Sequence, residues 1–208
     1  FPTAKLILPQ IVIDDLKGAL DSGAFAEYAK IDLKTFYPSI PHELITKATK
    51  TKIRKAQFRR LIADALTTPT VPESRGGRDA DRSSVGVPQG LAISNVLAEI
   101  AMQGIDTAFR SRPGIWYKRY VDDILILTPE GEAQSTANEL IVALKALKLN
   151  PHDFGPDSKS KVDDLTEPFS FLGYKVEGGE ILVRRESILR FEGSIAKIFT
   201  AYSHKLQS

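Results

Sequence analysis

Residues 115–128 read IWYKRYVDDILILT, a stretch that decides how the rest of the chain can fold. Two short apolar runs flank a polar centre, Tyr120-Val121-Asp122-Asp123, and this pattern predicts a tight β-hairpin with both aspartates at its tip. Another strand is expected at residues 25–33 (FAEYAKIDL), with Asp32 near its end; its imperfect alternation leaves a helix open as the alternative. Helical patterns cover residues 14–20, 42–66, 94–109 and 132–147, and a second hairpin is expected where residues 169–176 and 181–184 flank Gly178-Gly179.

The order of these elements predicts the fold class. When the two middle helices count as one connection, the order is β-α-β-β-α-β, the split βαβ (ferredoxin-like) arrangement. We therefore expect an α+β fold in which helices cover one face of an antiparallel sheet. The first strand and the middle hairpin are neighbours in that topology, so Asp32, Asp122 and Asp123 can converge. Converging carboxylates repel one another, and a hard divalent cation such as Mg²⁺ relieves the repulsion. The alternative is that Asp122 and Asp123 form only a polar turn and Asp32 only a strand-end cap.

Composition limits the classes of function. The 208 residues suffice for one or two domains, and 42% hydrophobic with 26% charged residues argues against global disorder. The net charge of +2 neither indicates nor excludes a nucleic-acid partner, so local clusters must decide. The lack of cysteine excludes disulfides, thiolate metal sites and cysteine nucleophiles. No signal peptide or membrane-length apolar run is visible, so we expect a cytoplasmic (intracellular) protein with no membrane partner, and a first residue other than Met suggests a fragment.

Four segments together resemble the motifs of reverse transcriptases, in the family's order. They are IDLKTFYPSI at residues 31–40, GVPQGLAISN at residues 86–95, YVDD at residues 120–123 and FLGY at residues 171–174. The resemblance extends from about residue 25 to residue 184 and implies a polymerase palm. The second segment resembles bacterial retroelement or phage-defence (antiviral defence) enzymes more than retroviral ones.

The resemblance implies an RNA-directed DNA polymerase, which transfers a nucleotide from a dNTP to a primer 3′-hydroxyl on an RNA template, with a DNA or RNA primer. Two Mg²⁺ ions, or Mn²⁺ in their place, would perform this chemistry. It further implies that the catalytic metal ligands are Asp32, Asp122 and Asp123, with the Leu33 carbonyl as a further ligand. The nucleotide would contact Tyr37, Phe36 and Gln89, and Lys159 would lie near the leaving pyrophosphate. The primer grip would consist of Phe171, Leu172 and Gly173. Tyr37 would lie beneath the sugar and exclude a 2′-hydroxyl, whereas Phe36 is the better core candidate.

The same resemblance divides the chain. Residues 1–24 would be a partial fingers segment, and residues 25–167 the palm, with a finger-like helical insertion around 42–86. Residues 168–186 would form the primer-grip-like hairpin, and residues 187–208 the start of a thumb or a C-terminal helix.

A basic stretch at residues 47–60 has two interpretations. It contains seven basic residues and no acidic one, with Lys47, Lys50, Arg54, Arg59 and Arg60 as candidate nucleic-acid contacts. A solvated helix face explains such a charge run equally well.

Two further functions stay open. The same fold can support template-independent or protein-primed DNA synthesis, or serve as a non-catalytic nucleic-acid-binding or assembly module. Few basic residues precede Asp32, namely Lys5, Lys17 and Lys30, so little is available to grip a triphosphate. We therefore expect the isolated chain to polymerise poorly or not at all, and to need a partner protein or further chain segments.

Overall fold

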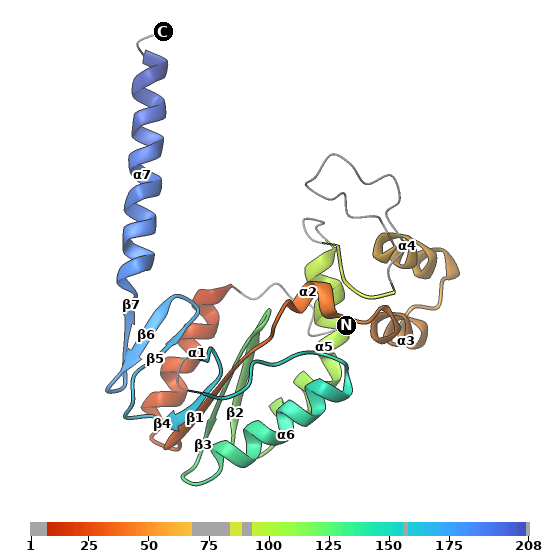
Figure 1. Ribbon diagram of the computed structural model, residues 1–208, viewed down its shortest axis with the longest axis horizontal. Helices are drawn as coiled ribbons and strands as arrows, with labels where there is room; N and C mark the ends of the chain where they lie inside the picture. Colours follow the sequence, from red (N-terminus) through yellow and green to blue (C-terminus); the bar gives the residue numbers. More distant parts are fainter. Residues whose placement is uncertain (1–7, 68–83, 89–92, 156–157, 207–208) are drawn as a thin grey trace.

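A four-stranded antiparallel sheet forms the centre of the molecule, in a computed structural model that describes residues 8–67, 84–88, 93–155 and 158–206. Its strands are β1 (Glu27–Asp32), β2 (Trp116–Tyr120), β3 (Asp123–Thr128) and β4 (Lys161–Asp164). They lie in the order β2-β3-β1-β4, and every neighbouring pair is antiparallel (Figure 1). This order confirms the predicted split βαβ arrangement and the α+β class.

Two long helices cover one face of this sheet. Helix α5 (Ser94–Arg110) precedes β2, and α6 (Ala133–Ala146) follows β3. The side chains of Ile31, Ile124 and Ile126 belong to the core cluster on this face and are 0% exposed. Alternate residues of a strand point to opposite faces, so these three positions identify the helix-covered side.

The opposite face of the main sheet is covered as well, whereas the sequence predicted helices on one face. Helix α1 (Pro9–Asp21) and a three-stranded sheet of β5 (Phe169–Phe171), β6 (Tyr174–Glu177) and β7 (Glu180–Val183) contribute to a second core cluster, together with Tyr28, Leu125 and Leu127. The ILIL run of β3 can therefore be apolar at every position, because both of its faces are buried.

The C-terminal strands differ from the prediction in two ways. Residues 169–176 form β5 and β6 rather than one strand, because Leu172 and Gly173 take positive φ values of 49° and 85° and reverse the chain. The fourth strand of the main sheet is β4, which was not predicted. Its sequence, KVDD, is almost wholly polar because β4 lies at the sheet edge, where a strand needs few apolar residues.

The predicted 42–66 helix is two helices, α3 (His42–Lys52) and α4 (Ala56–Leu66), which follow the short α2 (Phe36–Ser39). The Arg59 Nη1 atom donates to the Ile53 carbonyl at 3.2 Å, and so satisfies a backbone acceptor at the break. Phe58 and Leu61 of α4 are apolar, yet they are 53% and 62% exposed. In α4 only Leu66 is fully buried, so the helix is held mainly at its C-terminal end.

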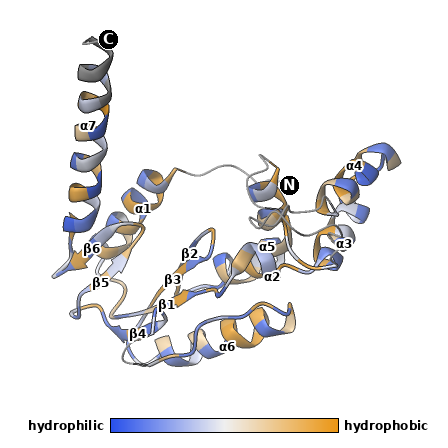
Figure 2. Ribbon diagram, turned by 45° about the horizontal axis from the view of Figure 1, so that its top comes forward, coloured by the Kyte–Doolittle hydropathy of each residue, from blue (hydrophilic) through white to orange (hydrophobic). Residues whose placement is uncertain are grey.

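The last helix, α7 (Arg185–Leu206), extends away from the rest of the molecule (Figures 1 and 2). Helix α1 begins at Pro9, earlier than the predicted residue 14, with proline at a position where helices tolerate it. No helix in the described part of the chain has the length and the apolar character that a membrane span requires.

Candidate active site

The β1–β3 pairing brings the predicted catalytic residues to one end of the sheet. Asp32 and Asp123 are directly opposite each other in the register, so their side chains emerge on the same face. Val121 and Asp122 form the two-residue turn between Tyr120 and Asp123. The Leu33 amide donates to the Asp122 carbonyl at 3.3 Å, which ties this turn to the end of β1.

Two of the three carboxylates lie against basic side chains. Asp32 Oδ2 lies 3.2 Å from His152 Nε2 and 3.9 Å from Lys159 Nζ, whereas Asp123 Oδ1 lies 3.6 Å from Lys30 Nζ. Within the described ranges, no set of three or more His, Asp and Glu side chains is arranged to hold a metal ion. Each of these two carboxylates therefore associates with nearby basic groups, as Coulomb attraction favours.

The electrostatics of the site nevertheless suit a hard cation. Burial raises the pKa of Asp123; Lys30 opposes this, while Asp122 and Asp32 raise the pKa further. The carboxylate of Asp123 therefore lies close enough to Asp32 and Asp122 for their negative charges to raise its pKa. Oxygen ligands on one sheet end, under mutual repulsion, fit Mg²⁺ or Mn²⁺ chemically.

Tyr37 lies beside this site. Its hydroxyl donates to Asn95 Oδ1 at 2.5 Å, so the start of α5 holds the ring in place. Burial raises the pKa of Tyr37, and the negative charge of Asp122 raises it further, so the phenol lies close to the Val121-Asp122 turn. Phe36 is only 3% exposed and belongs to the core, so it is not available to a nucleotide. Gln89 lies outside the described residues.

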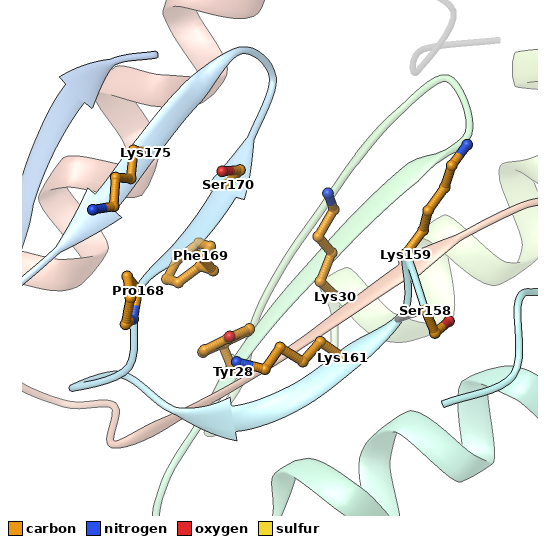
Figure 3. Close-up of a pocket in the computed structure, with 9 residues that line it drawn as sticks. All are labelled: Tyr28, Lys30, Ser158, Lys159, Lys161, Pro168, Phe169, Ser170 and Lys175. Carbon is orange, nitrogen blue, oxygen red and sulfur yellow. The ribbon is translucent and has the colours of Figure 1, made fainter. Parts of the chain in front are cut away.

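A pocket of about 340 Å³ lies between β1, β4 and the β5–β6 hairpin (Figure 3). Four lysines line it, together with the aromatic residues Tyr28 and Phe169; the lysines are Lys30, Lys159, Lys161 and Lys175. Lys30 and Asp32 are two residues apart on β1 and therefore share a sheet face. The pocket thus opens on the same side of the sheet as the carboxylates. Its lysines give it the charge to hold phosphate groups.

The expected primer grip has a defined geometry. Phe171 is 1% exposed and packs in the second core cluster, so it supports the hairpin from within. Leu172 and Gly173 form the turn, and the Gly173 carbonyl accepts hydrogen bonds from the Arg184 amide at 3.1 Å and the Ser187 hydroxyl at 3.1 Å. These bonds connect the turn to the start of α7.

The basic stretch is divided by the break between α3 and α4. Lys47, Lys50, Arg54 and Arg60 are exposed, whereas Arg59 is half-buried and holds the Ile53 carbonyl. A nucleic-acid role therefore remains a prediction for the exposed members.

Sequence reasoning missed three residues of the site. No local sequence pattern indicates that the side chain of His152 contacts Asp32. The spacing of Lys30 and Asp32 along one strand could have identified the lysine. Arg119 follows Lys118 and looks like a second surface charge in the sequence, but its side chain is 0% exposed and pairs with Asp106 and Glu99 of α5.

Comparison with known proteins gives the family. The family model described as reverse transcriptase (RNA-dependent DNA polymerase) matches residues 8–176. The protein YkfC of Escherichia coli is 23% identical over 70% of this chain and 45% of its own length. An uncharacterized 91 kDa protein in a cob intron of Schizosaccharomyces pombe is 35% identical over 75 residues, which are 36% of this chain and 9% of that protein. The chain thus spans less than half the length of either relative.

Solved structures show the same fold. Apo telomerase from Candida tropicalis, truncated from its C-terminal domain, matches with a TM-score of 0.61 and 11% identity over 86% of this chain and 40% of that one. Telomerase from Candida albicans, in complex with a TWJ fragment of telomeric RNA, gives a TM-score of 0.56 and 16% identity over 88% and 36%. The family model covers most of the chain, and the carboxylate-bearing hairpin lies within it. The chain therefore belongs to the reverse transcriptase family.

Proposed function

We propose that this chain is the catalytic palm of an RNA-directed DNA polymerase that adds deoxynucleotides to a primer 3′-hydroxyl. The observation that carries the proposal is the register of β1 and β3, which sets Asp32 opposite Asp123 beside the Val121-Asp122 turn. Nucleotidyl transfer needs carboxylates of this kind at one point, because two divalent ions must be held close together.

The residues of the chain have separate roles in this reaction. Asp32 and Asp122, with Asp123 and the Leu33 carbonyl as further oxygen donors, would hold two Mg²⁺ ions. When bound, such ions activate the attacking hydroxyl and stabilise the departing pyrophosphate. Tyr37, whose hydroxyl donates to Asn95, would supply the ring beneath the sugar. A ring held in that position excludes a 2′-hydroxyl by steric conflict.

The lysine pocket supports binding of a phosphate-bearing strand. Lys161 and Lys175 lie on either side of the groove between the main sheet and the β5–β6 hairpin, and each is paired with a neighbouring carboxylate at 2.7 Å. Phosphates can replace these exposed pairs at little cost, since surface ion pairs contribute little to stability. Lys159 is 69% exposed and lies 3.9 Å from Asp32, a position from which it can contact a leaving pyrophosphate.

Other chain segments or a partner protein would complete the grip on the triphosphate. The resemblance of the second motif to bacterial enzymes, together with a relative encoded in an intron, favours a retroelement or phage-defence role.

The test is primer extension by the full-length protein. A poly(rA) template with an oligo(dT) primer, dTTP and Mg²⁺ should give extended product. Asp32→Asn and Asp122→Asn should each lower the rate by at least about a hundredfold, because an amide is a poor ligand for these ions. Asp14→Asn, an exposed change on α1, is the matched control and should not alter the rate.

Template controls separate the alternatives. Extension that persists without template indicates untemplated or protein-primed synthesis. Nucleic-acid binding without any extension, in Mg²⁺ and in Mn²⁺, indicates a non-catalytic module and contradicts the proposal.

A further inference from the structure

A buried ionic network joins α5 to β2 directly beneath the catalytic turn. The Arg119 Nε and Nη2 atoms donate to the two carboxylate oxygens of Asp106 at 3.0 and 2.7 Å, and Nη2 also donates to Glu99 Oε2 at 2.8 Å. The Tyr117 hydroxyl donates to the same Asp106 at 2.8 Å. The side chains of Arg119 and Asp106 are both 0% exposed.

The remaining nitrogen of Arg119 reaches the turn itself. Its Nη1 atom donates to the Val121 carbonyl at 2.8 Å. Val121 has a φ of +58°, in the left-handed region that glycine adopts freely and β-branched residues avoid. A conformation of this kind persists only where the surrounding structure enforces it. Asp122 is the next residue, so a contact that holds the Val121 carbonyl also constrains the backbone from which the Asp122 carboxylate projects.

The charges of the network keep the arginine ionised. Burial alone would lower the pKa of Arg119, but hydrogen bonding and attraction from Asp106, followed by Glu99, raise it overall. A planar guanidinium can contact one carboxylate in bidentate fashion and a separate carbonyl at once, whereas a lysine ammonium cannot match that fork. The arginine is therefore suited to join a helix to a turn.

The same helix also holds Tyr37, through Asn95 at its N-terminal end. Asn95, Glu99 and Asp106 all belong to α5. Helix α5 thus contacts Tyr37, the residue expected beneath the sugar, directly, and reaches the turn that carries Asp122 through Arg119.

We infer that Arg119 is a positioning residue for the nucleotidyl transfer proposed above: anchored on α5 by Asp106 and Glu99, it holds the strained Val121 carbonyl and so directs the Asp122 carboxylate toward Asp32. Arg119 itself touches neither the nucleotide nor the metal ions. The inference rests on the proposed function for its catalytic consequence.

The test compares Arg119→Lys with two controls in the full-length protein. Arg112→Lys makes the same chemical change at a half-exposed pair with Glu139, on the loop after α5. Tyr117→Phe removes a buried hydrogen bond to Asp106 without touching the turn. Steady-state primer extension gives kcat and the KM for dTTP, urea unfolding gives stability, and electron paramagnetic resonance gives the affinity for Mn²⁺ alone.

Arg119→Lys should lower kcat 10- to 100-fold while the KM for dTTP changes less than threefold, and should weaken Mn²⁺ binding at least fivefold. Tyr117→Phe should lower stability but leave kcat and Mn²⁺ affinity within threefold, as should Arg112→Lys. Should Arg119→Lys fail to fold, Glu99→Gln loosens the same anchor at a half-buried position and should give an intermediate loss of kcat.

Two results would overturn the inference: a kcat for Arg119→Lys within threefold of the parent, or an equal loss of kcat and Mn²⁺ affinity in Tyr117→Phe. If the parent protein extends no primer, the proposed function fails, and Mn²⁺ binding decides the inference alone. Unchanged Mn²⁺ affinity in Arg119→Lys would then contradict it, and a selective loss would support it.

Discussion

The lysine pocket between the two sheets makes a quantitative prediction about primer binding. Replacing Lys161 and Lys175 by glutamine removes two positive charges that line the pocket from opposite sides. Each lysine–phosphate contact contributes about 0.7 to the slope of log K against log salt for a single strand, and about 0.9 for a duplex. The double variant should therefore bind with a slope smaller by about 1.4 to 1.8 units.

The same slopes give the loss of affinity. Relative to 1 M salt, where the electrostatic contribution vanishes, two lost contacts weaken binding at 0.1 M by about 25- to 60-fold, or roughly 2 kcal/mol. The assay is fluorescence anisotropy of a labelled primer–template at five salt concentrations from 0.1 to 0.5 M. Calcium in place of magnesium prevents turnover during the titration.

The control is Lys145→Gln, in the last turn of α6, with Lys148→Gln, two residues beyond that helix; α6 covers the opposite face of the main sheet. This pair carries the same charge change and should leave the slope unaltered. If both double variants lowered the slope equally, the phosphate-binding interpretation of the pocket would be refuted, because a general effect of net charge would then explain the decrease.

Three other predictions follow from named contacts. Tyr37→Ala should raise ribonucleotide incorporation more than it lowers the rate with dNTPs; unchanged exclusion of ribonucleotides in single-turnover assays would assign the selection to another residue. Neutralising Arg54 and Arg60 together should reduce the salt slope by about one to two units if they touch phosphates, and an unchanged slope would identify a solvated helix face. Glu27 accepts a hydrogen bond from the Ala133 amide at the start of α6, and this bond lowers its pKa. Glu27→Gln should therefore cost about 1 kcal/mol of unfolding free energy at pH 7, a difference that shrinks as pH falls below about 4 and Glu27 itself becomes protonated. Urea titrations at pH 7 and below about pH 4 measure this difference in unfolding free energy, with the exposed Glu130→Gln as the control.

Strands β1, β2 and β3 of the main sheet were predictable because their signals are local. The polar centre YVDD between two apolar runs favours a hairpin, and the order of helices and strands then limits the topology to a few arrangements. The prediction failed where local signals were weak or ambiguous. β4 is a short polar edge strand with no hydrophobic alternation, and the Leu172-Gly173 turn lies inside a run that otherwise has the composition of one strand.

The candidate site divides in the same way. Asp32, Asp122 and Asp123 could be named from the sequence, because a carboxylate at a strand end or hairpin tip is visible without any knowledge of its neighbours. The partners of charged side chains could not. Lys118 and Arg119 are adjacent on β2 and look alike in the sequence, yet Lys118 pairs with Asp15 of α1 at 2.6 Å and Arg119 is buried against α5. Consecutive residues of a strand face opposite sides of the sheet. The hydrophobic and turn patterns of the sequence determine most of the strands and their order. Which helix packs on which side of the sheet depends on contacts between distant segments, so only the packed structure assigns each charged side chain its partner.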